Sequence, residues 1–239
     1  MALFRGPKIT TTGLILALDA ANKNSYPGSG TSWKDLSGNN NTGTLTNGPT
    51  FSAANMGCIV FDGSNDYANI TTTSLFNFST GDFSVDIWYT ISSNSGSPND
   101  WVSPFSKGGY NNGDFATLLN RSPGHPDNKK IRFYVGGSAR LIVDQESVAT
   151  NVVVNKWYNY SVSRISGVVY AYVFGNLAGS TSFASSISNS NNITIAASVG
   201  GASEYPLDGK VSMFKIYNRG LSASEVLQNY NATKSRFGY

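Results

Sequence analysis

The sequence predicts an all-β protein, a sandwich of two antiparallel sheets with one short helix near the C-terminus. Short stretches in which apolar and polar residues alternate recur along the chain, and this is the period of a half-buried strand. Loops rich in Gly, Asn, Ser and Pro separate these stretches, as in all-β folds. The chain has 239 residues, a length at which β sandwiches often form one domain.

In chain order, residues 1–12 are expected to form an N-terminal arm and residues 13–239 a single domain. The first half of the domain contains Asn- and Gly-rich segments such as 35–43, which favour turns. The strands expected in this half are 14–20, 58–62 and 67–71.

Phe83 to Thr90 has the clearest alternation in the chain. Its apolar residues share one face, so Asp86 and Trp88 lie side by side on the other face. Ser166-Gly167 is a two-residue hairpin signal between two further strands. The strands expected after Thr90 are 101–106, 115–119, 130–135, 139–144, 157–164, 168–174 and 193–199.

The chain closes with a strand at 210–217, where Val211, Met213 and Tyr217 are expected on one face and Phe214 and Ile216 on the other. Both faces are partly apolar, so a second sheet should cover one and another element the other. Residues 222–232 are expected to form that element, a helix. Its start has the capping-box spacing from Ser222 to Glu225, with a hydrophobic staple from Leu221 to Val226.

These segments resemble the laminin-G-like jelly rolls of the concanavalin A-like lectin and glucanase superfamily. The resemblance rests on the Ile-Tyr-Asn-Arg-x-Leu-Ser-x-x-Glu end at 216–225 and on the order of the segments 13–20, 33–39, 59–67 and 83–88. It implies a two-sheet antiparallel jelly roll. The lead Phe4-Arg5-Gly6-Pro7 resembles that of standalone tailed-bacteriophage virion proteins.

Composition excludes several classes of protein. The formal net charge is only +3 and charged residues make up 13% of the chain, which favours neither nucleic acid nor membrane surfaces as partners. A single cysteine, Cys58, excludes an internal disulfide framework, and we expect it to be buried. The first residues lack the apolar run of a signal peptide, so we expect synthesis in a host cytoplasm without export.

An enzymatic role is not expected. A retaining glycosidase needs two carboxylates close together, but Asp86 has no acidic neighbour at 84, 88 or 90. A partner on another strand remains an alternative. The only histidine, His125, lies in a proline-bracketed loop, a poor platform for a catalytic triad.

Glycan binding is the expected chemistry of any site, because aromatic faces beside polar side chains suit sugars. The alternative is that the tryptophans belong to the core. The ligand-binding candidates are Asp86, Trp88, Trp101, Tyr110, Arg132 and Tyr134.

No cofactor is required, but calcium is a possible ligand because it prefers clustered loop oxygens. Asp62, Asn65 and Asp66 are the metal candidates, and residues 35–41 offer similar oxygens. The alternative reading is that Asp and Asn bond their own backbone in turns, and we favour it.

The predicted function is that of a non-catalytic bacteriophage virion surface protein, either a capsid decoration or a fibre or adhesion component. Its expected partners are virion structural proteins or copies of itself, together with a host or environmental glycan. Contacts to another chain would come from residues 1–12 or 234–239. The alternatives are a free carbohydrate-binding module and, less favoured, a glycoside hydrolase.

Overall fold

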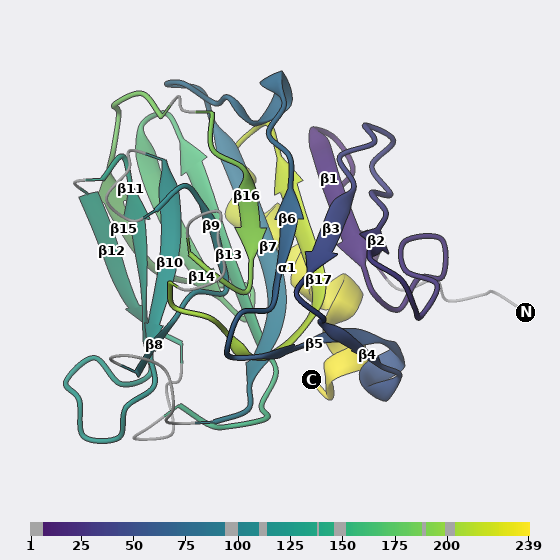
Figure 1. Cartoon of the computed structure of the whole chain (residues 1–239). Helices are drawn as coiled ribbons and strands as arrows, with labels where there is room; N and C mark the ends of the chain where they lie inside the picture. Colours follow the sequence, from purple (N-terminus) through teal and green to yellow (C-terminus); the bar gives the residue numbers. More distant parts are fainter. Residues whose placement is uncertain are drawn as a thin grey trace, which may run out of the picture.

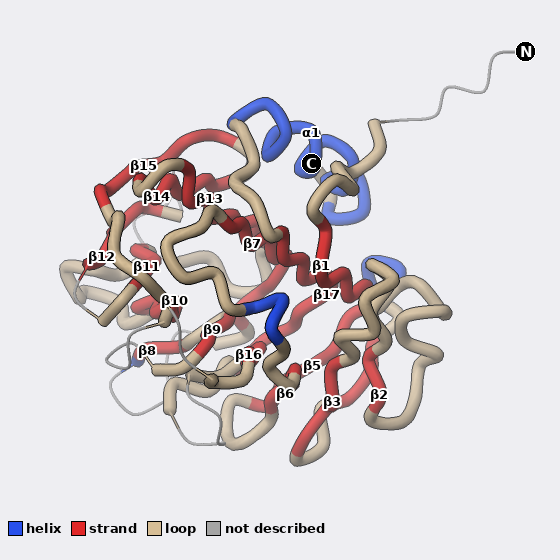
Figure 2. Tube along the Cα trace, turned by 90° about the horizontal axis from the view of Figure 1, so that it is seen from above, coloured by secondary structure: helices blue, strands red, loops and turns tan. Residues whose placement is uncertain are grey.

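A computed structural model shows the predicted all-β sandwich of two antiparallel sheets (Figure 1). It describes residues 7–93, 100–109, 114–137, 139–145, 152–187, 190–198 and 204–239. Viewed from above, the two sheets lie one over the other and helix α1 lies outside them (Figure 2). The jelly-roll class expected from the sequence is therefore confirmed.

Sheet A has the order β15-β14-β13-β7-β17-β5-β4, and β1 also pairs with β17. Its centre is β7 beside β17, where Lys215 lies opposite Asp86. The strands are β1 (Leu14–Asp19), β4 (Thr50–Ser52), β5 (Cys58–Asp62), β7 (Phe83–Ile91), β13 (Tyr158–Ile165), β14 (Val168–Val173), β15 (Asn176–Ser182) and β17 (Asp208–Tyr217).

Sheet B has the order β12-β11-β10-β9-β16-β6-β3-β2, and β8 also pairs with β10. Its strands are β2 (Ser32–Trp33), β3 (Gly43–Thr46), β6 (Tyr67–Ile70), β8 (Trp101–Val102), β9 (Phe105–Lys107), β10 (Phe115–Asn120), β11 (Lys130–Val135), β12 (Ala139–Asp144) and β16 (Ile193–Ile195).

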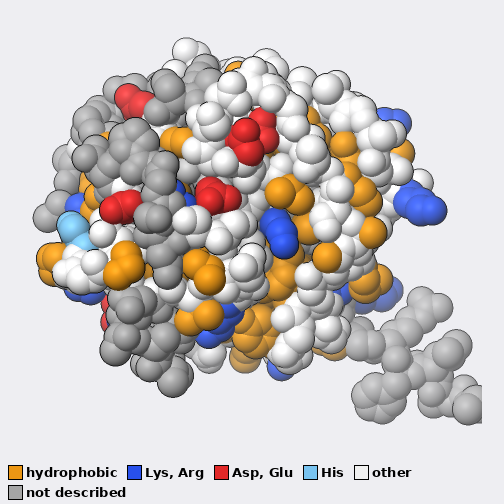
Figure 3. Space-filling model, turned by 60° about the horizontal axis from the view of Figure 1, so that its bottom comes forward, with side chains coloured by type: hydrophobic (Ala, Val, Ile, Leu, Met, Phe, Trp, Pro, Cys, Tyr) orange, Lys and Arg blue, Asp and Glu red, His pale blue; other side chains and the backbone are white. Residues whose placement is uncertain are grey.

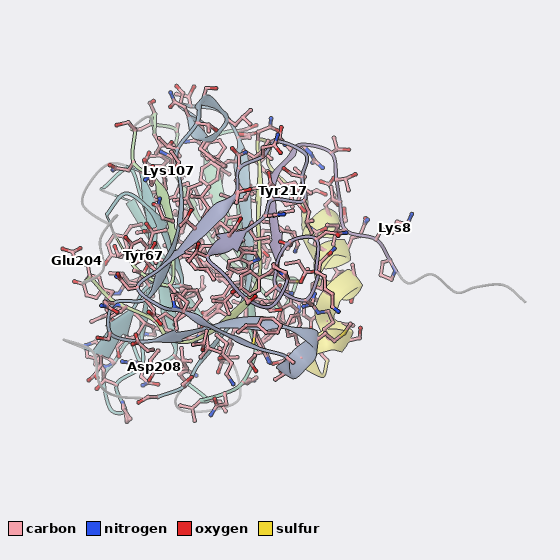
Figure 4. All side chains as sticks on the ribbon, turned by 45° about the vertical axis from the view of Figure 1, so that its right-hand side comes forward. Lys8, Tyr67, Lys107, Glu204, Asp208 and Tyr217 are labelled. Carbon is pink, nitrogen blue, oxygen red and sulfur yellow. The ribbon has the colours of Figure 1, made fainter. Side chains whose placement is uncertain are left out.

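One large hydrophobic core fills the space between the sheets. Phe83 from sheet A stacks on Phe115 from sheet B with ring centroids 5.3 Å apart, a favourable offset geometry. Lys107 (labelled in Figure 4) is buried, and its Nζ lies 2.6 Å from Oδ2 of the buried Asp114. Residues alternate in and out of this core along β10 and β11, so Asn120, Arg132 and Tyr134 face outward from sheet B.

The predicted faces of β17 need one correction. Val211 belongs to the inner core together with Phe214 and Ile216, whereas Met213 and Tyr217 face outward. The pairing of β17 with β7 shifts register between Val211 and Met213. This bulge inserts an extra residue and reverses the alternation, which the sequence pattern alone did not show.

Helix α1 (Ala223–Thr233) covers the outer face of sheet A and continues as the 3-10 turn η4 (Lys234–Phe237). The predicted capping box is present, with reciprocal bonds between Ser222 and Glu225. Leu221 and Val226 are both buried in one cluster with Tyr217, as the staple requires. The helix therefore docks as the sequence predicted.

The described part of the N-terminal arm lies on the same helix (Figure 4). The backbone N–H of Thr10 donates to Asn229 at 2.7 Å and Gln228 donates to the carbonyl of Lys8 at 2.7 Å. At the other end, the Tyr239 hydroxyl donates to the carbonyl of Trp157 at 2.5 Å. Arm and tail thus contact their own domain, and a contact to another chain stays a prediction.

Several strand boundaries differ from the prediction. The expected strand 101–106 is divided into β8 and β9 around Pro104, which has no N–H for a ladder bond. The expected strand 193–199 ends at Ile195, because Ala196 has a φ of 70°. The 3-10 turns η1 (Ala54–Met56) and η2 (Ser74–Phe76) and the strands β2, β3, β4 and β15 were not predicted.

Candidate functional site

The outer face of sheet B carries an aromatic and arginine surface at β8, β10 and β11. Trp101 lies opposite Asn120, and Leu118 lies opposite Arg132 in the ladders. Arg132 therefore reaches across Leu118, and its guanidinium carbon lies 4.5 Å from the centre of the Trp101 ring. Such stacking is a cation–π contact. We call Trp101, Asn120, Arg132, Tyr134 and Asp127 the Trp101 platform.

Hydrogen bonds fix the orientation of the Arg132 guanidinium. Its Nη1 donates to the Tyr134 hydroxyl at 3.3 Å, and its Nη2 donates to the carboxylate of Asp127. Lys130 adds a second cation, 3.7 Å from Asp127. Partial burial would raise the pKa of Asp127, but the hydrogen bond and charge of Arg132 outweigh it and lower that pKa. Asp127 therefore stays ionised and holds Arg132 in place.

The loop between β10 and β11 completes the platform. His125 meets the Trp101 ring edge-on, with ring centroids 5.8 Å apart. Its Nδ1 accepts the backbone N–H of Asp127 at 3.0 Å, which gives the loop a defined shape. The histidine is exposed, and Figure 3 shows it on the surface beside hydrophobic side chains.

Two hydrogen-bond donors of the platform have no partner. Asn120 is fully buried, its Oδ1 accepts the N–H of Ser122 at 3.0 Å, and its Nδ2 has no partner. The Nε of Arg132 is likewise buried and without a partner. Buried donors left unpaired cost free energy, and a rearrangement that exposed these two would let an acceptor on a bound molecule pair with them.

Of the sequence candidates, Trp101, Arg132 and Tyr134 therefore come together. Tyr110 lies outside the described residues. Sequence reasoning missed Asn120 and Asp127, and it treated His125 only as a poor catalytic base. The available signal was the proline-bracketed loop, which places a histidine and an aspartate just before the Arg132 strand.

The predicted open position of Asp86 and Trp88 is wrong. Trp88 is fully buried, stacks on Phe237 with ring centroids 4.0 Å apart, and donates from Nε1 to Thr233 at 2.9 Å. The alternation did place both side chains on one outer face of sheet A, but the C-terminal helix and tail cover that face. A ligand in solvent cannot reach them.

Asp86 forms a buried ion pair instead of a binding surface. Its carboxylate accepts from Lys215 Nζ, from Asn159 Nδ2 at 3.0 Å and from the Ser161 hydroxyl at 2.6 Å. Burial would raise the pKa of Asp86, but the charge and hydrogen bond of Lys215 reverse the shift and lower it. The residue has a structural role.

The oxygens of the calcium candidates accept hydrogen bonds from nearby protein groups. Asp62 accepts the N–H of Ser64 at 2.8 Å, Asp66 accepts the N–H of Asp62 at 3.3 Å, and the carbonyl of Asn65 accepts from Asn47 at 2.8 Å. In the described ranges, no group of three or more His, Cys, Asp or Glu side chains is placed to hold a metal. The bond from Ser64 to Asp62 is the expected Asx turn, and calcium stays a prediction.

The segment 35–41 has the same explanation. Asp35 accepts the backbone N–H of Ala17 and of Ser37, both at 2.8 Å, and that of Asn41 at 3.0 Å. The carboxylate thus ties the loop to β1.

Cys58 is fully buried as expected, and burial raises the pKa of its thiol.

A sandwich of two antiparallel sheets of this kind has a lectin-like fold. The sequence profile described as the concanavalin A-like lectin/glucanases superfamily, laminin-G type, matches residues 62–227. The chain belongs to this superfamily. No curated protein matches it. None of the helices in the described part of the chain is long and apolar enough to cross a membrane.

Solved structures share the fold at low identity. The botulinum neurotoxin serotype D ligand binding domain in complex with N-acetylneuraminic acid has a TM-score of 0.70, 17% identity, and coverage of 92% of this chain and 51% of that one. The binding domain of Paraclostridial Mosquitocidal Protein 1 has a TM-score of 0.70 and 18% identity, and the match covers 92% of this chain and 52% of that one. Trypanosoma rangeli sialidase in complex with sialic acid has a TM-score of 0.68 and 16% identity, and the match covers 95% of this chain and 34% of that one. The chain thus spans about half of these proteins or less.

Proposed function

We propose that this protein is a non-catalytic glycan-binding domain and that the Trp101 platform is its binding site. The observation that carries the proposal is the stack of Arg132 on the half-buried Trp101, with two unpaired donors beside it. Membership of a lectin-containing superfamily supports it. So do the sialic acid ligands named for two proteins with the same fold.

The chemistry of the platform suits an acceptor-rich sugar. The partly exposed guanidinium of Arg132 is a donor, and the partly exposed carboxylate of Asp127 is an acceptor for sugar hydroxyls. Because Arg132 is already stacked and hydrogen-bonded, little side-chain entropy is lost on binding. Trp101 is half-buried, and the part of its ring that Arg132 leaves exposed is an apolar surface for the C–H face of a sugar.

A glycan array with wild type and Trp101→Ala tests the proposal. We expect binding to weaken at least tenfold in the variant, because an aromatic contact of this kind is worth ~1.5 kcal/mol. Tyr67→Ala is the matched control, since Tyr67 is a half-buried aromatic on β6 of the same sheet (Figure 4). Equal loss in both variants, or no binding by wild type, would contradict the proposal.

The finer proposal is that the domain is displayed on a bacteriophage virion, as a capsid decoration or an adhesion component, after synthesis in the host cytoplasm. It rests on the resemblance of the Phe4–Pro7 lead, and none of the relatives named above is a phage protein. Mass spectrometry of purified virions from a phage encoding the chain tests it. Absence of the chain from the particles, or turnover of a β-glucan by the pure protein, would contradict this role.

A further inference from the structure

A pocket lies where the edges of the two sheets meet, and none of its described lining residues belongs to the Trp101 platform. It has a volume of about 230 Å³ and is lined by residues from the end of β12 and from the β14–β15 hairpin. This volume is below the ~300 Å³ at which pockets for drug-sized ligands begin, so the pocket suits a single ring. Its lining residues include Asp144, Gln145, Phe174, Leu177 and Ala178.

Gln145 is the buried polar residue of this pocket. Its side chain is 1% exposed, and its Oε1 accepts the hydroxyl of Tyr89. That bond fixes the amide, and Nε2 is left buried with no hydrogen-bond partner. Because an unpaired buried donor is costly, a ligand oxygen placed here would be stabilised.

Asp144 supplies an acceptor beside this donor. It is exposed, and no described residue hydrogen-bonds or ion-pairs with its carboxylate. The donor of Gln145 and the acceptor of Asp144 therefore belong to consecutive residues at the end of β12. Hydroxyl groups both donate and accept, so a ligand with neighbouring hydroxyls satisfies both.

Phe174 and Leu177 provide the apolar wall. Leu177 is 58% exposed, so its side chain can contact a ligand in the pocket. Phe174 has a φ of 51° in a two-residue turn, a conformation that is uncommon for a bulky residue. The aromatic side chain is thus held at the pocket at some cost in backbone energy.

The charges around the pocket select against charged ligands. The Lys156 ammonium lies 5.5 Å from the centre of the Phe174 ring, so a cation on that ring would meet a like charge. An anion would meet Asp144. We propose that this pocket is a second binding site and that its ligand is a neutral sugar ring, with its C–H face on Phe174 and Leu177 and its hydroxyls on Asp144 and Gln145.

The second site extends the proposed glycan binding but does not need the Trp101 platform to be correct. The two lie close together on sheet B, since Asp144 is opposite Lys130 and Ile142 is opposite Arg132. A branched or extended glycan could then engage both sites. Linked binding of this kind raises the apparent affinity without new contacts.

An NMR titration of the full chain tests the second site. The probes are the methyl glycosides of glucose, galactose and mannose, with N-acetylneuraminic acid as the charged comparison. We expect at least one neutral glycoside to shift the methyl signals of Leu177 and Ala178, and the acid to leave them in place. Asp144→Asn should weaken binding about tenfold, the worth of a hydrogen bond to a charged group.

Two further variants make the result decisive. Ala178→Phe should abolish the shifts by filling the pocket, and Glu204→Gln, which changes an exposed carboxylate outside both proposed sites, should leave them unchanged. Shifts that survive both Asp144→Asn and Ala178→Phe, or no shift with any neutral glycoside, would overturn the second site. Loss of these shifts in Trp101→Ala would assign them to the platform and would overturn it too. Binding at Trp101 alone would leave only the proposed function standing.

Discussion

The buried pair of Asp86 and Lys215 offers the sharpest test of the structural role of Asp86. The two side chains are 4% and 2% exposed, and they lie directly opposite each other on the two central strands of sheet A. Asp86→Asn would leave the Lys215 cation buried without its partner, and Lys215→Met would leave the carboxylate. Removing one partner of a buried pair costs ~3–5 kcal/mol of unfolding free energy.

The double variant Asp86→Asn with Lys215→Met separates the pair from the other contacts of each residue. It leaves no unpaired charge, so we expect it to be more stable than either single variant, because replacing a buried pair by neutral groups is often close to neutral. Urea denaturation at neutral pH measures all four proteins. Single variants that each cost less than ~1 kcal/mol would refute the reasoning, because charges at the surface behave in that way.

The pH dependence of stability in Lys215→Met gives an independent test, because the direction in which its stability deficit changes with pH can be predicted. The Lys215 charge holds the folded pKa of Asp86 below its ordinary value, so the pair stabilises the protein at neutral pH, and this contribution is lost as the pH falls through the acidic range. In Lys215→Met burial should raise that pKa instead. The stability deficit of the variant should then shrink on acidification, and a deficit that grows would contradict the sign.

The remaining predictions concern the covering of sheet A. Trp88→Ala should lower the unfolding free energy, measured by urea denaturation, by ~3–5 kcal/mol. Hydrogen exchange of residues 223–239 should also become faster. If a folded Trp88→Ala protein lost glycan binding, Trp88 would belong to the binding site after all. Glu225→Gln should cost ~0.5–1 kcal/mol at neutral pH, because glutamine can still act as the N3 residue of the capping box but loses the ion pair with Arg219. The hydrogen bond from Arg219 lowers the pKa of Glu225 from 4.5 to about 2, so thermal unfolding should show the difference from wild type fading between these pH values, and a difference that persists below pH 2 would contradict it.

The predictions that the structure confirms are those that depend on residues close together in the sequence. The capping box from Ser222 to Glu225 acts over three residues, and the hairpin at Ser166-Gly167 needs two positive φ angles, which are present. The alternation in β7 likewise follows from backbone geometry. In the same way Asp35 bonds amides of its own loop at Ser37 and Asn41.

The candidate site could be predicted only in part. The residue types at Trp101, Arg132 and Tyr134 indicated sugar binding, but their meeting depends on β8 and β11 pairing with opposite edges of β10. Asp86 and Trp88 carried the same signal and proved to be interior. Nothing in the alternation of a strand says which of its two faces another element covers.

By itself the sequence determined the strand periods, the helix cap, the hairpin turn and, through these, the class of sandwich, because each depends on contacts a few residues apart. Only the tertiary structure decided which aromatic face stays open. Contacts distant in the chain make that choice: the tail lays Phe237 on Trp88, and β10 brings Arg132 to Trp101. The bulge that moves Val211 into the core was also decided by the tertiary structure, because it is defined only by the pairing of β17 with β7.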